Sequence, residues 1–328
     1  MNGAPSRKLP SFIVHRSSFS AAILLAIVLV AMIALAISLG AVSLDDPAAR
    51  TILLRLRLPR VLLAAAIGAT LAVAGVTFQT LLRNPLADPF ILGVSGGAAA
   101  GAAVATALRL ARFPGVVPFV AFLGACGATA AVFLLARRRD HTDPTRLLLS
   151  GLVLNAFFSA VILIAFSLSR QADLTAALRW MMGNISAATW TDVTVVTIPL
   201  LTAMLVLAFI ANDLRLLAFG EEDAKARGVD VERVKLIGFG TASIITGAAV
   251  AVSGIIGFVG LLVPHLIRLM WRRDFRYLLP LCGLGGAILV IGADLLSRTL
   301  ITSAELPIGA FTAILGVPFF LSLLRRER

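Results

Sequence analysis

Side chains that form disulfides, hold metals or bind nucleotides are scarce in this sequence. Cys126 and Cys282 lie within apolar segments, and neither has metal-site spacing to any of the three histidines. None of the three lysines, Lys8, Lys225 and Lys235, belongs to a GxxxxGK(S/T) phosphate loop. We therefore interpret the cysteines as packing residues, predict no metal site, and expect any ATP that this protein uses to be bound by another chain.

Charge is scarce as well. Asp, Glu, Lys and Arg make up 14% of the 328 residues, whereas 59% are hydrophobic and the mean hydropathy is +0.98. This apolar surface exceeds what one soluble core could bury, so we expect an integral membrane protein. The net charge of +12 lies between apolar runs, which fits orientation in a membrane rather than nucleic-acid binding.

Ten apolar segments approach the about 20 residues that a membrane-spanning helix needs. The first, within the uncharged stretch Ser17 to Leu44, is too long for a cleavable signal, so we predict a retained span that starts in the cytoplasm. The predicted spans are 20–40, 61–82, 91–108, 116–136, 147–168, 190–210, 236–254, 256–270, 278–297 and 307–324. The fold class is therefore all-α and polytopic, a single transmembrane domain over 1–328.

The basic residues give the orientation. With both termini inside, 20 of the 29 Lys and Arg residues fall in cytoplasmic segments, as the positive-inside rule requires. The cytoplasmic segments include 1–16 and the loop 211–235. Four arginines are exceptions that crowd one outer loop before the second span, Arg50, Arg55, Arg57 and Arg60. Something other than topology must hold them there.

The two halves of the chain show a repeat. GATLAVAGV at 68–76 matches GAAVAVSGI at 247–255, and a proline follows ten residues after the last glycine of each copy. The copies begin five spans apart, so they should cross the membrane in opposite directions. Inverted repeats are typical of transporters, although two membrane helices rich in Ala, Gly and Val also match by chance.

The segment 83–103, RNPLADPFILGVSGGAAAGAA, reads as a cytoplasmic turn into the third span. Its prolines cannot continue a helix, and Asn84 and Asp88 can cap the next one. Gly93, Gly97 and Gly101 recur every four residues, which predicts a smooth stripe for close helix packing.

The segment RWMMGN, 179–184, falls on the outer side between the fifth and sixth spans. Trp180 suits the headgroup region, and Met181 and Met182 with Gly183 are candidates for a pathway or gate. A plain interfacial anchor is the alternative.

Two further polar sites lie in the second half. His265 follows a proline and is interpreted as a polar packing residue rather than a ligand for iron or haem. Asp294 and Arg298 are four residues apart and can pair on one helix face. Acidic residues are almost absent from the other predicted spans, which argues against proton coupling.

The stretch GEEDAKARGVDVERVK, 220–235, is the most polar part of the chain. It lies in the predicted loop between the sixth and seventh spans, and its composition favours short helices that Gly220 and Gly228 can interrupt. We interpret this stretch as a segment on which a cytosolic ATPase could act; a solvated loop without a partner is the alternative.

Seven motifs follow one another along the chain: RLRLPR (55–60), RNPLADPFILGVSGGA (83–98), WMMG (180–183), FGEEDAKARG (219–228), GFVGLLVPHLIRL (257–269), ADLLSR (293–298) and AELPIG (304–309). Together they resemble the permease subunits of ABC importers for haem, iron-siderophores and cobalamin. The resemblance runs from about residue 50 to the C-terminus. It implies a homodimer of ten-span chains with the pathway on its two-fold axis, two cytosolic ATPase subunits that bind ATP and Mg, and one periplasmic substrate-binding protein.

The resemblance also assigns residues. By position, seven residues look like the coupling helices that dock into a groove on the ATPase: Gly220, Glu221, Glu222, Asp223, Ala224, Arg227 and Gly228. Asp223 stands where Ala is more usual, which leaves the docking contacts open. Arg57, Arg60 and Arg298 occupy the positions of outward-facing arginines that meet acidic residues on the binding protein. Contact with lipid headgroups is the alternative.

We therefore hypothesise a permease of a bacterial inner membrane, with both termini cytoplasmic, no cofactor and no catalytic site in this chain. It would pass an iron complex inward by alternating access, with haem ahead of ferric siderophore and cobalamin. The predicted spans hold no His or Tyr array that would bind iron. An ion-driven secondary transporter and a membrane scaffold without transport are the rival classes.

Overall fold

The computed structural model describes residues 11–39, 49–138, 141–271, 274–300 and 306–326. Within these ranges the regular structure is helical apart from one short antiparallel hairpin, β1 (Arg137–Arg138) and β2 (His141–Thr142). Residues 1–10 of the predicted N-terminal segment and the first two residues of AELPIG lie outside the described ranges. The all-α polytopic fold class is confirmed.

Seven helices of the described chain are long and apolar enough to cross a membrane. They are α1 (Ser11–Ser38), α3 (Leu58–Leu81), α5 (Val116–Ala136), α6 (Pro144–Leu168), α8 (Trp190–Phe209), α11 (Val231–Ser253) and α13 (Phe275–Thr299). Three shorter apolar helices fill the other predicted spans, α4 (Val94–Ala107), α12 (Val259–Met270) and α14 (Ile308–Arg326). With 14 and 12 residues, α4 and α12 rise about 21 and 18 Å, so neither crosses the about 30 Å apolar core alone.

The remaining elements are short. They are α2 (Ala49–Ile52), the π-helical turn η1 (Leu53–Arg57), the 3₁₀ turn η2 (Leu110–Arg112), α7 (Gln171–Met181), α9 (Ala211–Leu217) and α10 (Glu221–Ala226). Because α2 and η1 run directly into α3, residues Arg50–Leu81 form one helical rod. The arginine-rich segment predicted as an outer loop is therefore the start of a helix.

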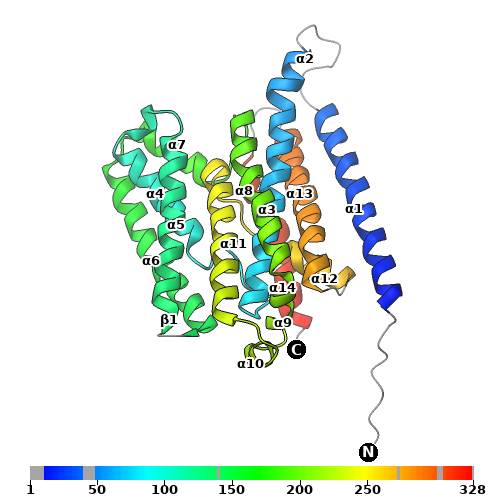
Figure 1. Cartoon of the computed structure of the whole chain (residues 1–328). Coiled ribbons are helices and arrows are strands. Elements are labelled where there is room, and N and C mark those ends of the chain that lie inside the picture. Colours follow the sequence, from blue (N-terminus) through cyan, green and yellow to red (C-terminus); the bar gives the residue numbers. More distant parts are fainter. Residues whose placement is uncertain (1–10, 40–48, 139–140, 272–273, 301–305, 327–328) are drawn as a thin grey trace, which may run out of the picture.

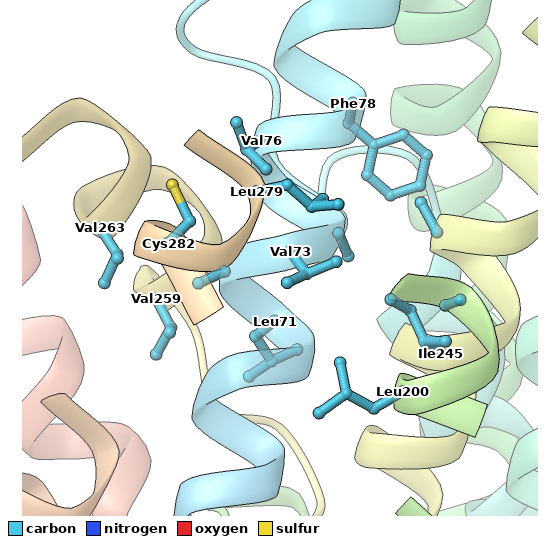
Figure 2. Close-up of a cluster of buried hydrophobic side chains, with 14 of the residues drawn as sticks. Leu71, Val73, Val76, Phe78, Leu200, Ile245, Val259, Val263, Leu279 and Cys282 are labelled. Carbon is cyan, nitrogen blue, oxygen red and sulfur yellow. The ribbon is translucent and has the colours of Figure 1, made fainter. Parts of the chain in front are cut away.

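The helix α3 lies at the centre of the molecule. In Figure 2 its side chains Leu71, Val73 and Phe78 are surrounded by residues from α8, α11, α12 and α13. All three are almost fully buried, and Phe78 meets Phe239 of α11 edge to face at 5.3 Å. By contrast, α1 packs at the edge with little of its surface buried, as expected for a helix that faces lipid.

Glycines allow helices of the two halves to touch. A side chain at Gly75 would overlap the backbone of Gly260 in α12, and one at Gly68 would overlap Gly286 in α13. These contacts place the first repeat copy, 68–76, directly against the second half of the chain. Close backbone approach through small residues is how helices pack tightly in lipid.

The predicted glycine stripe on α4 is confirmed in part. Gly97 and Gly101 face the backbone of α5 so closely that neither position has room for a Cβ atom. Gly93 has another role, since its φ of +85° starts α4 in a left-handed conformation. The prediction that Asn84 and Asp88 cap the third span is wrong: each carboxyl or amide oxygen accepts from the backbone N–H two residues on, within the preceding turn.

The two ends of the bundle carry different elements. In Figure 1 the start of α1, the β1–β2 hairpin, α10 and the end of α14 lie at one end, and α2 and α7 lie at the other. We name these the inner and outer ends, following the orientation that the basic residues predict. The helices α3 and α11 run in opposite directions between them, as an inverted repeat requires.

Candidate functional site

The charged stretch 220–235 folds at the inner end as the short helix α10, a turn at Gly228 and the first turns of α11. Gly220 and Gly228 both have positive φ and bound α10, as predicted. Within α10, Glu221 and Ala224 are buried against the protein. The other predicted coupling residues are displayed at the surface: Glu222, Asp223, Arg227 and Gly228 are exposed and Gly220 is half-buried.

Beneath α10 lies a group of charged and polar residues, which we call the inner polar cluster: Arg83, His141, Thr142, Glu221, Glu232 and Lys235. The Lys235 ammonium is only 4% exposed and donates to Glu221 Oε2 at 2.8 Å, to Glu232 Oε1 at 3.1 Å and to the Thr142 carbonyl at 2.7 Å. The Arg83 guanidinium reaches Glu221 Oε1 at 3.4 Å. The cluster thus ties α10 to α11, to the β1–β2 hairpin and to the end of α3.

Glu232 is the second carboxylate of this cluster. Glu232 accepts hydrogen bonds from the Thr142 hydroxyl and from the Lys235 ammonium, which lies beside it. The Thr142 hydroxyl donates to Glu232 Oε2 at 2.6 Å. Glu232 therefore links the first turn of α11 to the β1–β2 hairpin.

The same cluster contains the one group of metal-ligand type found in the described residues. His141 Nδ1 lies 3.7 Å from Glu221 Oε2 and 3.6 Å from Glu232 Oε1. Lys235 already binds both carboxylates, so its ammonium occupies the place that a cation would take. The geometry fits an ion-pair cluster rather than a metal centre.

At the outer end, three helices meet around Asp294. This carboxylate is 1% exposed and accepts from Arg60 Nε of α3 at 2.9 Å, and Arg298 Nε lies 3.5 Å from its other oxygen. The predicted pair of Asp294 and Arg298 is present, and Arg60 joins it across the helix interface. The triad links α3 to α13, close to the end of α1.

The arginines of this region also cap α1. Arg57 donates to the Ile37 carbonyl at 2.9 Å, and Arg298 donates to the carbonyls of Leu39 at 3.1 Å and of Ala36. Cations at a helix C-terminus satisfy its free carbonyls and complement its dipole.

Arg57, Arg60 and Arg298 are therefore largely buried within the chain. Their contact with a binding protein stays a prediction. Arg50 and Arg55 are the exposed arginines of the same rod.

A hollow of about 460 Å³ lies beside this triad at the outer end. Arg60, Arg179, Met182, Asn184 and Ser297 line it, together with the start of α14. Its lining thus contains two guanidinium groups and the flexible thioether of Met182, a side chain that is 53% exposed. Met182 and Gly183 of the WMMG segment lie on the wall of this hollow, which we call the outer hollow.

The WMMG segment itself is firmly packed. Gly183 has φ +81°, and a Cβ there would lie 2.7 Å from the Ile255 carbonyl. Asn184 N–H donates to the Ser253 carbonyl at 2.9 Å, which joins the segment to the end of α11. Trp180 packs on the cluster of α4, α5 and α11, and Met181 is half-buried, so Met182 alone of the four presents a large exposed side chain.

The model of the FecCD transport family matches residues 16–326. The chain belongs to the FecCD transport family. The hemin transport system permease protein HmuU of Yersinia pestis is 41% identical to it over 279 residues, which cover 84% of this chain and 83% of that protein. The cobalamin import system permease protein BtuC of Halobacterium salinarum is 42% identical over 277 residues, 84% of this chain and 74% of that one.

A solved structure also resembles this FecCD chain. It is described as a metal-chelate type ABC transporter in an inward-facing conformation, and it superposes with a TM-score of 0.86 at 31% identity over 94% of this chain and 99% of that chain. The resemblance to importer permeases is thus confirmed, and the chain is a multi-pass membrane component of the ABC transporter class. Family membership implies ATPase and binding-protein partners.

The sequence predicted the short helix α10 but not the inner polar cluster. Glu221 is separated from Arg83 by 138 positions, and Thr142 from Lys235 by 93. No local pattern joins residues so far apart. The one signal that could have found the cluster is that two of the three lysines, Lys225 and Lys235, belong to the charged stretch.

Proposed function

We propose that this FecCD chain is the permease of an ATP-driven importer that moves an iron complex across a bacterial inner membrane. A second copy of the chain forms the pathway with it. Two cytosolic ATPase subunits bind ATP and Mg, and a periplasmic binding protein delivers the cargo. The chain itself holds no cofactor and performs no chemistry on the cargo.

The observation that supports this proposal is the way in which α10 is anchored to the membrane helices. Its exposed face presents charged residues toward the inner end, while Glu221 fixes its buried face to three other segments through the inner polar cluster. A solvated loop without a partner needs no such anchorage. A segment that receives force from an ATPase does, because displacement of α10 must move the membrane helices rather than α10 alone.

Transmission follows the same contacts. Movement of α10 acts on α11 through Lys235, on the hairpin before α6 through Thr142, and on the end of α3 through Arg83. Since α3 is packed against α12 and α13 at backbone distance, these helices move as a body. Rocking of such bodies exposes the pathway to one side and then to the other.

The cargo is proposed to be haem, with ferric siderophore and cobalamin as alternatives. Relatives named for hemin and for cobalamin are equally similar, so identity does not separate these cargoes. The outer hollow carries Arg60 and the exposed Arg179. Guanidinium groups suit the two carboxylates of haem better than the mainly amide side chains of cobalamin.

Co-purification of the tagged chain from its native membrane tests the proposal. We expect an ATPase subunit at one to one with the permease, and a Soret absorbance band in the co-purified binding protein. An ATPase without that band would leave the mechanism standing and exclude haem in favour of siderophore or cobalamin. A permease that purifies without any ATPase would contradict the proposal.

A further inference from the structure

A second hollow, of about 680 Å³, lies at the inner end beside α10. Its wall combines the last turns of α3 and α12 with the first turn of α13 and the end of α9. The residues that matter here are Arg215, Phe219, Arg268, Leu269, Asp274 and Phe275. Neither the inner polar cluster nor the outer hollow includes any of these residues. We call this second hollow the basic hollow.

Positive charge exceeds negative charge in the basic hollow. Arg215 pairs with Asp274 at 3.3 Å and donates to Asn212, yet its buried Nε has no hydrogen-bond partner. Arg268 donates to the Gln79 side-chain oxygen, and no carboxylate in the described part of the chain pairs with it. One carboxylate therefore faces two guanidinium groups, one of which holds an unsatisfied donor. A buried donor without a partner is costly, so an anion in the hollow would be stabilised.

The rim of the basic hollow is apolar and lies where the membrane helices end. Leu269 is 58% exposed, the adjacent Met270 is 64% exposed, and Phe219 is 75% exposed. Trp271 and Tyr277 flank the connection between α12 and α13. Aromatic residues beside an apolar helix end are typical of the boundary between hydrocarbon and headgroups.

We propose that the basic hollow binds the headgroup of an anionic phospholipid. The guanidinium groups of Arg215 and Arg268 hold the phosphate, and Phe219 and Leu269 contact the glycerol and the start of the acyl chains. Basic pockets between membrane helices on the cytoplasmic side are suited to this chemistry. An acidic side chain of the ATPase would match the charge of the hollow but not its exposed apolar rim.

Lipid retention by the full-length chain tests this inference without any transport assay, so its result is independent of the proposed cargo and ATPase. The purified, delipidated protein is titrated with phosphatidylglycerol, phosphatidylcholine or inorganic phosphate, and bound molecules are counted by native mass spectrometry. Arg215→Gln and Arg268→Gln are compared with Arg146→Gln. Arg146 is a matched control, because it lies at the inner end, pairs with one aspartate and is 47% exposed against 42% for Arg215.

The expected result is one phosphatidylglycerol retained per wild-type chain, at least tenfold tighter than phosphatidylcholine. Retention should be lost in Arg215→Gln and unchanged in Arg146→Gln. If Arg268→Gln fails to fold because it loses its bond to Gln79, Arg215→Gln alone decides the outcome. Equal retention by all variants, or equal binding of phosphatidylcholine, would overturn the inference. So would binding of inorganic phosphate as tight as that of the lipid, or lower affinity for the ATPase in Arg215→Gln with lipid retention unchanged.

Discussion

Replacing Lys235 by Met should loosen α10 and destabilise the whole inner end. The ammonium is 4% exposed and contacts two carboxylates, of which Glu221 is 10% and Glu232 is 28% exposed. Without it, two mostly buried anions face each other with only the more distant Arg83 and His141 beside them. Removing one partner of a buried ion pair costs about 3–5 kcal/mol, so the midpoint of thermal unfolding should fall by roughly 4–7 °C in a chain of this length.

The double variant Glu221→Gln with Lys235→Met separates charge from packing. It removes one charge of each sign, so about 1–3 kcal/mol of the loss should return relative to Lys235→Met alone. Glu222→Gln is the surface control on the same helix, since Glu222 is exposed and should change stability by less than about 0.5 kcal/mol. Thermal unfolding in detergent, followed by tryptophan fluorescence, measures all three variants.

The second measurement is the amount of cargo imported for each ATP hydrolysed. In proteoliposomes with the ATPase subunits, Lys235→Met should hydrolyse ATP but import less cargo per ATP, because α10 moves without the helices beneath it. Glu222→Gln should instead weaken binding of the ATPase. A loss of stability below about 1 kcal/mol in Lys235→Met, or no recovery in the double variant, would refute the account of the cluster.

Three further predictions concern packing, pH and the outer arginines. Gly75→Ala should lower the free energy of unfolding by about 1–3 kcal/mol or more, because its Cβ would overlap the α12 backbone. In the control Gly240→Ala on α11, the new Cβ meets nothing within 4 Å, so this change should be neutral or stabilising. Thermal unfolding midpoints compare the two variants. Burial raises the pKa of Asp88 to about 6 although a backbone hydrogen bond lowers it, so the folded state loses stability as pH rises from about 4 to 6. Asp88→Asn should thus be more stable by at most about 3 kcal/mol at pH 7.5 and equal at pH 4, and lower stability at pH 7.5 would contradict this. Arg55→Glu, at an exposed site, should weaken capture of the binding protein without changing stability. Arg57→Glu should instead destabilise the chain, because that guanidinium is buried against α1. Unchanged capture by Arg55→Glu would show that the helical rod Arg50–Leu81 is not part of the docking surface.

The sequence predicted the helices well because their signal is local. Each predicted span contains a helix, and 116–136 agrees with α5 at both ends, since an apolar run bounded by glycine and arginine needs no tertiary information. The short helix between Gly220 and Gly228 was likewise predicted from turn residues and charge. The length of α4 and α12 was overestimated, because apolar composition continues through the turns that precede both helices.

What the sequence could not predict depends on contacts between distant segments. The outer arginines were interpreted as surface residues because their charge was visible, whereas their partners, Asp294 and the carbonyls that end α1, become neighbours only in the folded chain. The amphipathic helix α7 was not predicted because its polar residues separate it from the apolar runs. The interior contacts of Gly183 depend on a turn whose backbone conformation the motif does not reveal.

The most direct test of the central claim is uptake of haem into proteoliposomes that contain this chain, the two ATPase subunits and the binding protein. The account predicts uptake that requires ATP, is unaffected by collapse of the proton gradient, and falls when Glu222 and Asp223 on α10 are replaced by Ala. Uptake that persists without the ATPase and follows a proton gradient would contradict it and assign the chain to the secondary transporters.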